Sequence, residues 1–118
     1  MDMLRSMLQA KLHGVKVTSA DLHYEGSCGI DAALLEAAGL LVNQYIEIYD
    51  VTNGNRFSTY VISAPRGSGE ITLNGAAARR AMVGDTLIIA AYSLYDEAEL
   101  RTYRPVVVLV DDGNRPRR

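Results

Sequence analysis

The sequence contains very few of the residues that form disulfides and metal sites. It has one cysteine, Cys28, and two histidines, His13 and His23. One cysteine excludes an internal disulfide and a cysteine-based zinc site, and the two separated histidines make a poor metal set. We therefore expect no metal ion. Because no base is paired with it, Cys28 is expected to be a small buried residue rather than a nucleophile.

Long apolar runs and an excess of one charge are also missing. No apolar run is long enough to cross a bilayer, so we expect no membrane span. Twelve basic residues against fourteen acidic ones give a net charge of −2, which argues against binding to nucleic acid or an anionic membrane. The N-terminus lacks the layout of a signal peptide, and we expect a cytoplasmic protein. The common phosphate-loop, dinucleotide, zinc-peptidase and serine-elbow motifs do not occur.

The composition that remains is that of an ordinary globular protein. The chain has 118 residues, of which 48% are hydrophobic and 22% charged. These values predict one folded domain spanning residues 1–118. Only the last segment, residues 111–118 (DDGNRPRR), combines charge, glycine and proline with almost nothing apolar. We expect this tail to fray.

The apolar pattern predicts short strands joined by tight turns. Asn53-Gly54 is typical of a hairpin in which both turn positions have positive φ. The N-terminal segment fits a helical period about as well as an extended one, and we interpret it as a strand on topology alone. The predicted strands cover residues 3–13, 45–51, 56–63, 70–74, 86–92 and 106–110.

Helical signals are few and short. Asp31, the segment AALLEAA and then Gly39 have the order of an N-cap, two turns and a terminal glycine. Residues 76–82 and 96–101 are weaker candidates. Many short strands with a few short helices indicate a mainly β protein, most simply a small β-barrel.

The segment HYEGSCGID, residues 23–31, is the one that suggests unusual chemistry. Gly26 has no side chain, so its carbonyl is sterically open and its backbone is free to take strained dihedrals. Ser27 places a hydroxyl one residue after that carbonyl, where it can attack the preceding peptide bond. The residues alone leave the ordinary alternative open, because Gly and Ser are common turn formers.

Four motifs together make this chain resemble a known family. KLHGVKVTSADLHYEGSCGID, VTNGNRFSTY, LNGAAAR and VGD occur in this order and resemble the aspartate 1-decarboxylases, small pyruvoyl-dependent enzymes of pantothenate biosynthesis. The resemblance runs from about residue 7 to residue 110. It implies a six-stranded double-psi β-barrel with a few short helices. It also implies a homotetramer with sites between subunits.

The resemblance further implies that the proenzyme cuts itself between Gly26 and Ser27. The products would be a short chain, 1–26, and a long chain, 27–118, that begins with a covalent pyruvoyl group made from Ser27. This group would replace pyridoxal phosphate and would form an imine with L-aspartate, releasing carbon dioxide and then β-alanine. Thr59 resembles the family threonine that stabilises the oxyanion during cleavage.

The residues that contact substrate are also assigned through the resemblance. Lys11 and Arg56 match cations that hold the substrate carboxylates, Thr59 lies at a substrate-contacting position and Tyr60 matches the proton donor. Taken singly, these cations would be solvated charges and Tyr60 a half-buried aromatic. The loop Gly75, Ala76 and Ala77 matches one that lines the substrate through its backbone, and the possible supporting residues are His13, Tyr24 and Asn74.

The spacing of Arg56 and Tyr60 raises a geometric problem. The two side chains share one face of a predicted strand with Cα atoms about 13 Å apart, whereas Thr59 points to the other face. One small substrate contacts both only if Arg56 reaches, the strand bends or neighbouring subunits share the site. The family's arrangement, with sites between subunits, is the third of these.

Two departures and two alternatives accompany the resemblance. Tyr49 stands where many members have tryptophan, and the short basic tail gives no support for a separate maturation factor. One alternative is a non-catalytic β-barrel interaction module that never cleaves. The other is a hydrolase that uses Ser27 or Cys28 as a newly exposed N-terminal nucleophile.

Overall fold

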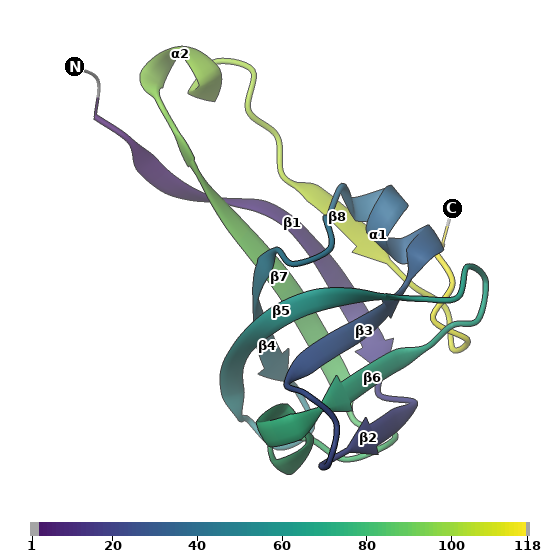
Figure 1. The fold of residues 1–118 in the computed structure, drawn as a ribbon. Helices are drawn as coiled ribbons and strands as arrows, with labels where there is room; N and C mark the ends of the chain where they lie inside the picture. Colours follow the sequence, from purple (N-terminus) through teal and green to yellow (C-terminus); the bar gives the residue numbers. More distant parts are fainter. Residues whose placement is uncertain (1–2, 118) are drawn as a thin grey trace.

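The computed structural model describes residues 3–117, which form a mainly β protein with eight strands (Figure 1). The strands are β1 (Arg5–Lys16), β2 (Ser19–Asp21), β3 (Ser27–Asp31), β4 (Tyr45–Asp50), β5 (Arg56–Ala64), β6 (Ile71–Asn74), β7 (Thr86–Tyr95) and β8 (Val106–Leu109). The helical elements are α1 (Ala32–Ala38), the 3₁₀ helix η1 (Gly75–Arg79) and α2 (Glu97–Leu100). All six predicted strands are confirmed, with shifted ends, including the N-terminal one.

Two of the eight strands, β2 and β3, were not predicted, and they flank the Gly26-Ser27 bond. The sequence of β3, SCGID, is poor in β-branched and aromatic residues. It nevertheless pairs with β5 on one side and β6 on the other, and all five of its residues are buried. Hydrogen bonds at both edges and burial outweigh its low intrinsic propensity.

The eight strands form one sheet in the order β2-β6-β3-β5-β4-β7-β1-β8. The pairs β2–β6, β3–β5 and β1–β8 are parallel, and the remaining neighbours are antiparallel. In Figure 1 the sheet curls on itself, while β1 and β7 extend beyond it together and β7 leads into α2. The curl encloses a core that includes the fully buried Leu12, Ile30, Leu34, Ile46, Ile48, Ile71, Leu73, Leu87 and Ile89.

The predicted helix after Asp31 is confirmed. The Asp31 carboxylate accepts a hydrogen bond from the Ala33 amide at 2.8 Å, and Gly39 ends the helix in the left-handed conformation with φ 73°. The same carboxylate accepts from the amides of Gly67 (2.9 Å) and Gly69 (2.8 Å). Burial opposes ionisation of Asp31, but these amides outweigh it and lower its pKa. Through these hydrogen bonds, the Asp31 carboxylate links β3, α1 and the loop before β6.

The two weaker helix predictions are confirmed in part. The segment predicted at 76–82 is the 3₁₀ helix η1, which begins and ends earlier. The segment predicted at 96–101 contains α2, whose N-terminus has a capping box made by Asp96 and Glu99. Among residues 3–117, no helix has the length and apolar character needed to span a membrane.

The Asn53-Gly54 signal correctly predicts an antiparallel hairpin, but the turn differs from the expected one. Of the two residues only Gly54 has positive φ, at 81°. The last register pair joins Tyr49 to Arg56, and the Asp50 carboxylate accepts hydrogen bonds from the amides of Thr52 (2.8 Å) and Asn53 (3.2 Å). An aspartate-capped loop, longer than a two-residue turn, therefore connects β4 and β5.

Residues 111–117 of the tail make specific contacts with the rest of the domain, and fraying of the tail stays a prediction; Arg118 lies outside the described residues. Asn114 is 2% exposed, and its side chain donates to the carbonyls of Lys16 and Gly69, both at 2.8 Å. It also accepts from the Lys16 amide at 2.8 Å, and Val110 forms a β-bridge with Pro116. One buried amide that satisfies three backbone groups fastens a polar segment that composition alone marks as loose.

Two carboxyl groups meet beneath the β4–β5 loop. Within residues 3–117, the buried Oδ2 of Asp50 receives no hydrogen bond from any N–H or O–H group. The carboxyl of Asp85 lies within hydrogen-bonding reach of it. A hydrogen bond between the two carboxyls requires one of them to carry a proton, and we expect Asp50 to carry it. Burial and the neighbouring Asp85 accordingly raise the pKa of Asp50, whereas this hydrogen bond and the Met82 amide lower the pKa of Asp85.

Asp50 and Asp85 make stability depend on pH with opposite signs, and the contribution of Asp50 can be tested separately. The pKa of Asp50 is higher in the folded chain, so its contribution to stability is lost as pH rises through the folded value. We expect Asp50→Asn, whose amide donates to Asp85 at every pH, to raise the melting temperature at pH 8 by roughly 4 °C, or about 1 kcal/mol. The gain should shrink toward pH 4. Thermal unfolding across this range measures it, with the exposed Asp112→Asn as control; a gain independent of pH would contradict the shared proton.

Candidate active site

Ser27 lies at the start of β3 with its hydroxyl held by two groups. The residue is 1% exposed, and its Oγ donates to the Glu25 carbonyl at 3.2 Å. The same oxygen accepts a hydrogen bond from Asn74 Nδ2 at 2.9 Å. Asn74 is the register partner of Ser27 in the antiparallel β3–β6 pair. Sheet pairing therefore fixes the hydroxyl directly after Gly26, next to the carbonyl that the sequence marks for attack.

Gly75, rather than Gly26, is the sterically constrained glycine. It has φ +64°, and a Cβ added to it would lie 2.8 Å from Gly26 Cα, 2.9 Å from Gly26 N and 3.0 Å from the Tyr24 carbonyl oxygen. Only glycine fits such a close approach of two backbones. Gly26 itself does not have positive φ, and a Cβ there would meet nothing within 4 Å. The strain expected at Gly26 is thus not seen in its φ, and the steric constraint comes from Gly75.

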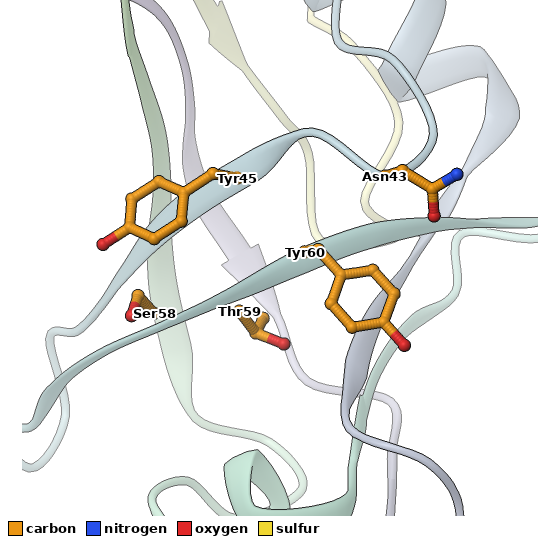
Figure 2. Close-up of a pocket in the computed structure, with 5 residues that line it drawn as sticks. All are labelled: Asn43, Tyr45, Ser58, Thr59 and Tyr60. Atoms are coloured by element: carbon orange, nitrogen blue, oxygen red, sulfur yellow. The ribbon is translucent and has the colours of Figure 1, made fainter.

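Thr59 and Tyr60 lie on the strand next to Ser27. Cys28 pairs with Val61 in the parallel β3–β5 pair, so one residue earlier Ser27 is level with Tyr60. Thr59 and Tyr60 line a cavity of about 560 Å³, together with Asn43, Tyr45 and Ser58. Figure 2 shows the rings of Tyr45 and Tyr60 pointing in opposite directions from adjacent strands. Tyr60 is 37% exposed, so part of this residue is open to solvent.

Arg56 lies on the same face of β5 as Tyr60, four residues away. The strand is regular from Arg56 to Tyr60, which puts their Cα atoms about 13 Å apart, as expected. Arg56 is opposite Tyr49 on β4, and its guanidinium carbon is 4.0 Å from the centroid of the Tyr49 ring. Within one chain, β5 therefore does not place Arg56 next to Ser27.

Lys11 and His13 are carried by β1. Lys11 pairs with Ala90, Ala90 with Glu47, and Glu47 with Ser58, so Lys11 and Ser58 share one face of the sheet. His13 is exposed on that face as well. Three strand steps separate β1 from β5, or about 14 Å along the sheet. The structure thus places both residues on the face of Arg56 and Tyr60 but on a distant strand.

Of the remaining predicted site residues, some are buried and others are exposed. Ala77 is buried in the core, whereas Ala76 is exposed at η1, and Tyr24 is 56% exposed. Cys28 is fully buried, as predicted. Burial raises the pKa of its thiol to about 12, so the thiol stays protonated at neutral pH and is a poor nucleophile in the intact chain.

The cavity contains three residues that the sequence analysis did not select: Asn43, Tyr45 and Ser58. Asn43 has φ 73°, and its backbone amide donates a hydrogen bond to the Val61 carbonyl at 2.8 Å. Tyr45 is the register partner of Tyr60. The sequence indicates only which face of its strand Tyr45 occupies. It does not indicate the cavity, because the cavity depends on how β4 and β5 pair.

Comparison with known proteins identifies the family. The family model described as aspartate decarboxylase matches residues 3–117. This chain belongs to the aspartate decarboxylase family. Curated aspartate 1-decarboxylases from Bordetella avium and Methylibium petroleiphilum are each 65% identical over 113 residues, which is 96% of this chain and 93% and 94% of theirs. The aspartate 1-decarboxylase of Ralstonia nicotianae is 61% identical over 113 residues.

Membership of the aspartate decarboxylase family settles the fold class. The chain has the mainly β, double-psi β-barrel fold expected from its motifs, with eight strands among the described residues instead of six. A rationally designed protein of known crystal structure is 22% identical with a TM-score of 0.49, covering 65% of this chain and 90% of the designed one. A likeness of that size does not assign a fold by itself.

Proposed function

We propose that this chain is an aspartate 1-decarboxylase, which converts L-aspartate to β-alanine and carbon dioxide for pantothenate biosynthesis in the cytoplasm. The observation that carries the proposal is the environment of the Gly26-Ser27 bond. Ser27 Oγ is buried and oriented by Asn74, and Gly75 packs directly against Gly26. High identity over nearly the whole chain to proteins of that name supports the same activity.

The first step we propose is self-cleavage. Ser27 Oγ turns from the Glu25 carbonyl and attacks the Gly26 carbonyl carbon. A C–O bond forms, the C–N bond breaks, the hydroxyl proton passes to the Ser27 nitrogen and the amide becomes an ester with a free amine. The Asn74 amide already donates to Oγ and stabilises negative charge on it. Tyr60 is level with Ser27, and Thr59 comes one residue before it on β5. Thr59 donates a hydrogen bond to the oxyanion that forms from the Gly26 carbonyl.

The ester then breaks by elimination. Loss of the Ser27 Cα proton expels the Gly26 carboxylate and leaves a dehydroalanine. Addition of water and release of ammonia give a pyruvoyl group at the head of chain 27–118, separated from chain 1–26. The described residues fit such a small planar group, because position 27 is buried, Asn74 presents a donor to it and Gly75 has no side chain to occupy the space.

A keto group bound at this position supplies the electron sink for loss of carbon dioxide from an α-amino acid. The chain's own residues then bind the substrate and protonate it. Arg56 binds a substrate carboxylate through its planar donors. Tyr60 lines the cavity level with residue 27 and delivers a proton to the substrate carbon that loses its carboxylate. The backbone of Gly75–Ala77 borders the substrate.

We infer that the complete site forms between subunits of a homotetramer. Arg56 is about 13 Å from Tyr60 along β5, and Lys11 and His13 lie on β1, four strands from β3. A neighbouring copy supplies the cations that one chain holds too far from its own Ser27. Light scattering of the purified protein measures the assembly; a monomer with full activity would contradict the shared site.

Denaturing mass spectrometry combined with an activity assay tests the proposed function. We expect fragments 1–26 and 27–118, with the long fragment reacting with hydrazine, and carbon dioxide released from aspartate. An intact chain after prolonged warming would favour a non-catalytic barrel. A long fragment that keeps a free serine amine would favour a hydrolase. Inactivity toward aspartate of a chain that cleaves and carries the ketone would contradict the substrate.

A further inference from the structure

Arg56 has an aromatic neighbour instead of an acidic one. Its guanidinium carbon lies 4.0 Å from the centroid of the Tyr49 ring, and the two residues are cross-strand partners. The ion pairs formed among residues 3–117 are Lys16–Asp112 and Arg66–Glu36, so no carboxylate of the described chain neutralises Arg56. The nearby Glu47 carboxylate is hydrogen-bonded by the Tyr45 hydroxyl.

The Tyr49 ring is itself fixed in place. Its hydroxyl lies 3.0 Å from the Tyr92 hydroxyl on β7, the strand on the other side of β4 from β5. Burial and the hydrogen bond with Tyr92 raise the pKa of Tyr49 to about 12, so the phenol stays neutral at physiological pH. The ring is therefore anchored at two points: by the β4 backbone and by a hydroxyl pair across the sheet.

We propose that Tyr49 is a positioning residue, which holds the Arg56 guanidinium in the orientation that binds a substrate carboxylate. This inference rests on the proposed function. An aromatic face attracts the guanidinium and sets its plane without using the N–H donors at its edge. A carboxylate in the same place would occupy those donors and compete with the substrate. Tyr49 lowers the conformational freedom of Arg56 before the substrate arrives.

The test compares Tyr49→Leu and Tyr49→Met with Tyr49→Phe. The first two variants remove the aromatic face, while Phe keeps it and serves as the matched control. We expect all of them to cleave to the 27–118 fragment. The Leu and Met variants should raise the KM for aspartate roughly fivefold with little change in kcat, as expected for loss of one exposed cation–π contact of about 1 kcal/mol. The Phe variant should remain within about twofold of the wild type, because the ring face persists.

A double-mutant cycle distinguishes positioning from a general structural effect. If Tyr49 acts through Arg56, then Tyr49→Leu adds no further increase in KM to an Arg56→Ala variant. An unchanged KM in both Leu and Met variants, or a full additional increase in the Arg56→Ala background, would overturn the inference. If the wild-type protein does not decarboxylate aspartate, the proposed function fails first and the inference about Tyr49 falls with it. A failure confined to the variants refutes the inference alone.

Discussion

Ser27→Ala is expected to give a folded, intact chain of 118 residues without decarboxylase activity. The substitution removes the only atom that can attack the Gly26 carbonyl from residue 27, so cleavage should fall below detection. Folding should survive, because the main loss is the hydrogen bond from Asn74, worth about 1 kcal/mol. Mass spectrometry after prolonged warming measures cleavage, circular dichroism measures folding, and carbon dioxide release measures activity.

The matched control is Ser63→Ala. Ser63 is exposed on β5, and its hydroxyl donates a long hydrogen bond to the adjacent Ala64 carbonyl at 3.5 Å. This variant should cleave and decarboxylate like the wild type. Normal processing of Ser27→Ala would show that another group breaks the bond, and the assignment of the nucleophile would be wrong.

Gly75→Ala is expected to slow self-cleavage by two orders of magnitude or more while the domain still folds. The new Cβ would lie 2.8 Å from Gly26 Cα and 2.9 Å from Gly26 N. Both are backbone atoms that have no rotamer to change, so the cleavage segment must shift away from Asn74. A displacement of about 1 Å at a reacting bond is enough to cost roughly a hundredfold in rate. The half-time of appearance of the 27–118 fragment measures the effect.

The control for Gly75→Ala separates the steric clash from backbone strain. Gly39 has a similar φ of +73°, but a Cβ there meets nothing within 4 Å. Gly39→Ala should therefore lose about 1 kcal/mol of stability yet cleave at the wild-type rate. If both alanine variants cleave equally fast, the approach of Gly75 to Gly26 plays no part in processing.

Local patterns in the sequence were enough for most of the secondary structure. The alternation in β4 and β5, the capping signals around α1 and the glycine after it each depend on neighbouring residues, and the structure has them where they were predicted. The strand β3 was missed because its residues have low β-propensity, and only its two neighbours make it a strand. The contact of the polar tail could not be predicted for the same kind of reason, since Asn114 binds Lys16 from 98 residues away.

The candidate site also combines features that the sequence shows with features that depend on the tertiary structure. That Ser27 follows Gly26 is a property of the sequence, and the motifs around both residues were sufficient to indicate the family. Nothing in those motifs shows that Asn74, 47 residues later, donates to Ser27 Oγ or that Gly75 touches Gly26. The same holds for the Arg56–Tyr49 contact, which follows from the register of β4 and β5.

The sequence by itself determined the candidate cleavage bond, the capped helix, the strand pattern and the family, because each depends on residue types at short and fixed spacing. Only the tertiary structure decided which groups surround that bond, that the carboxyls of Asp50 and Asp85 are neighbours and which face carries Arg56 and Lys11. These properties depend on strand pairing between distant segments, where a shift of one residue moves every side chain to the opposite face.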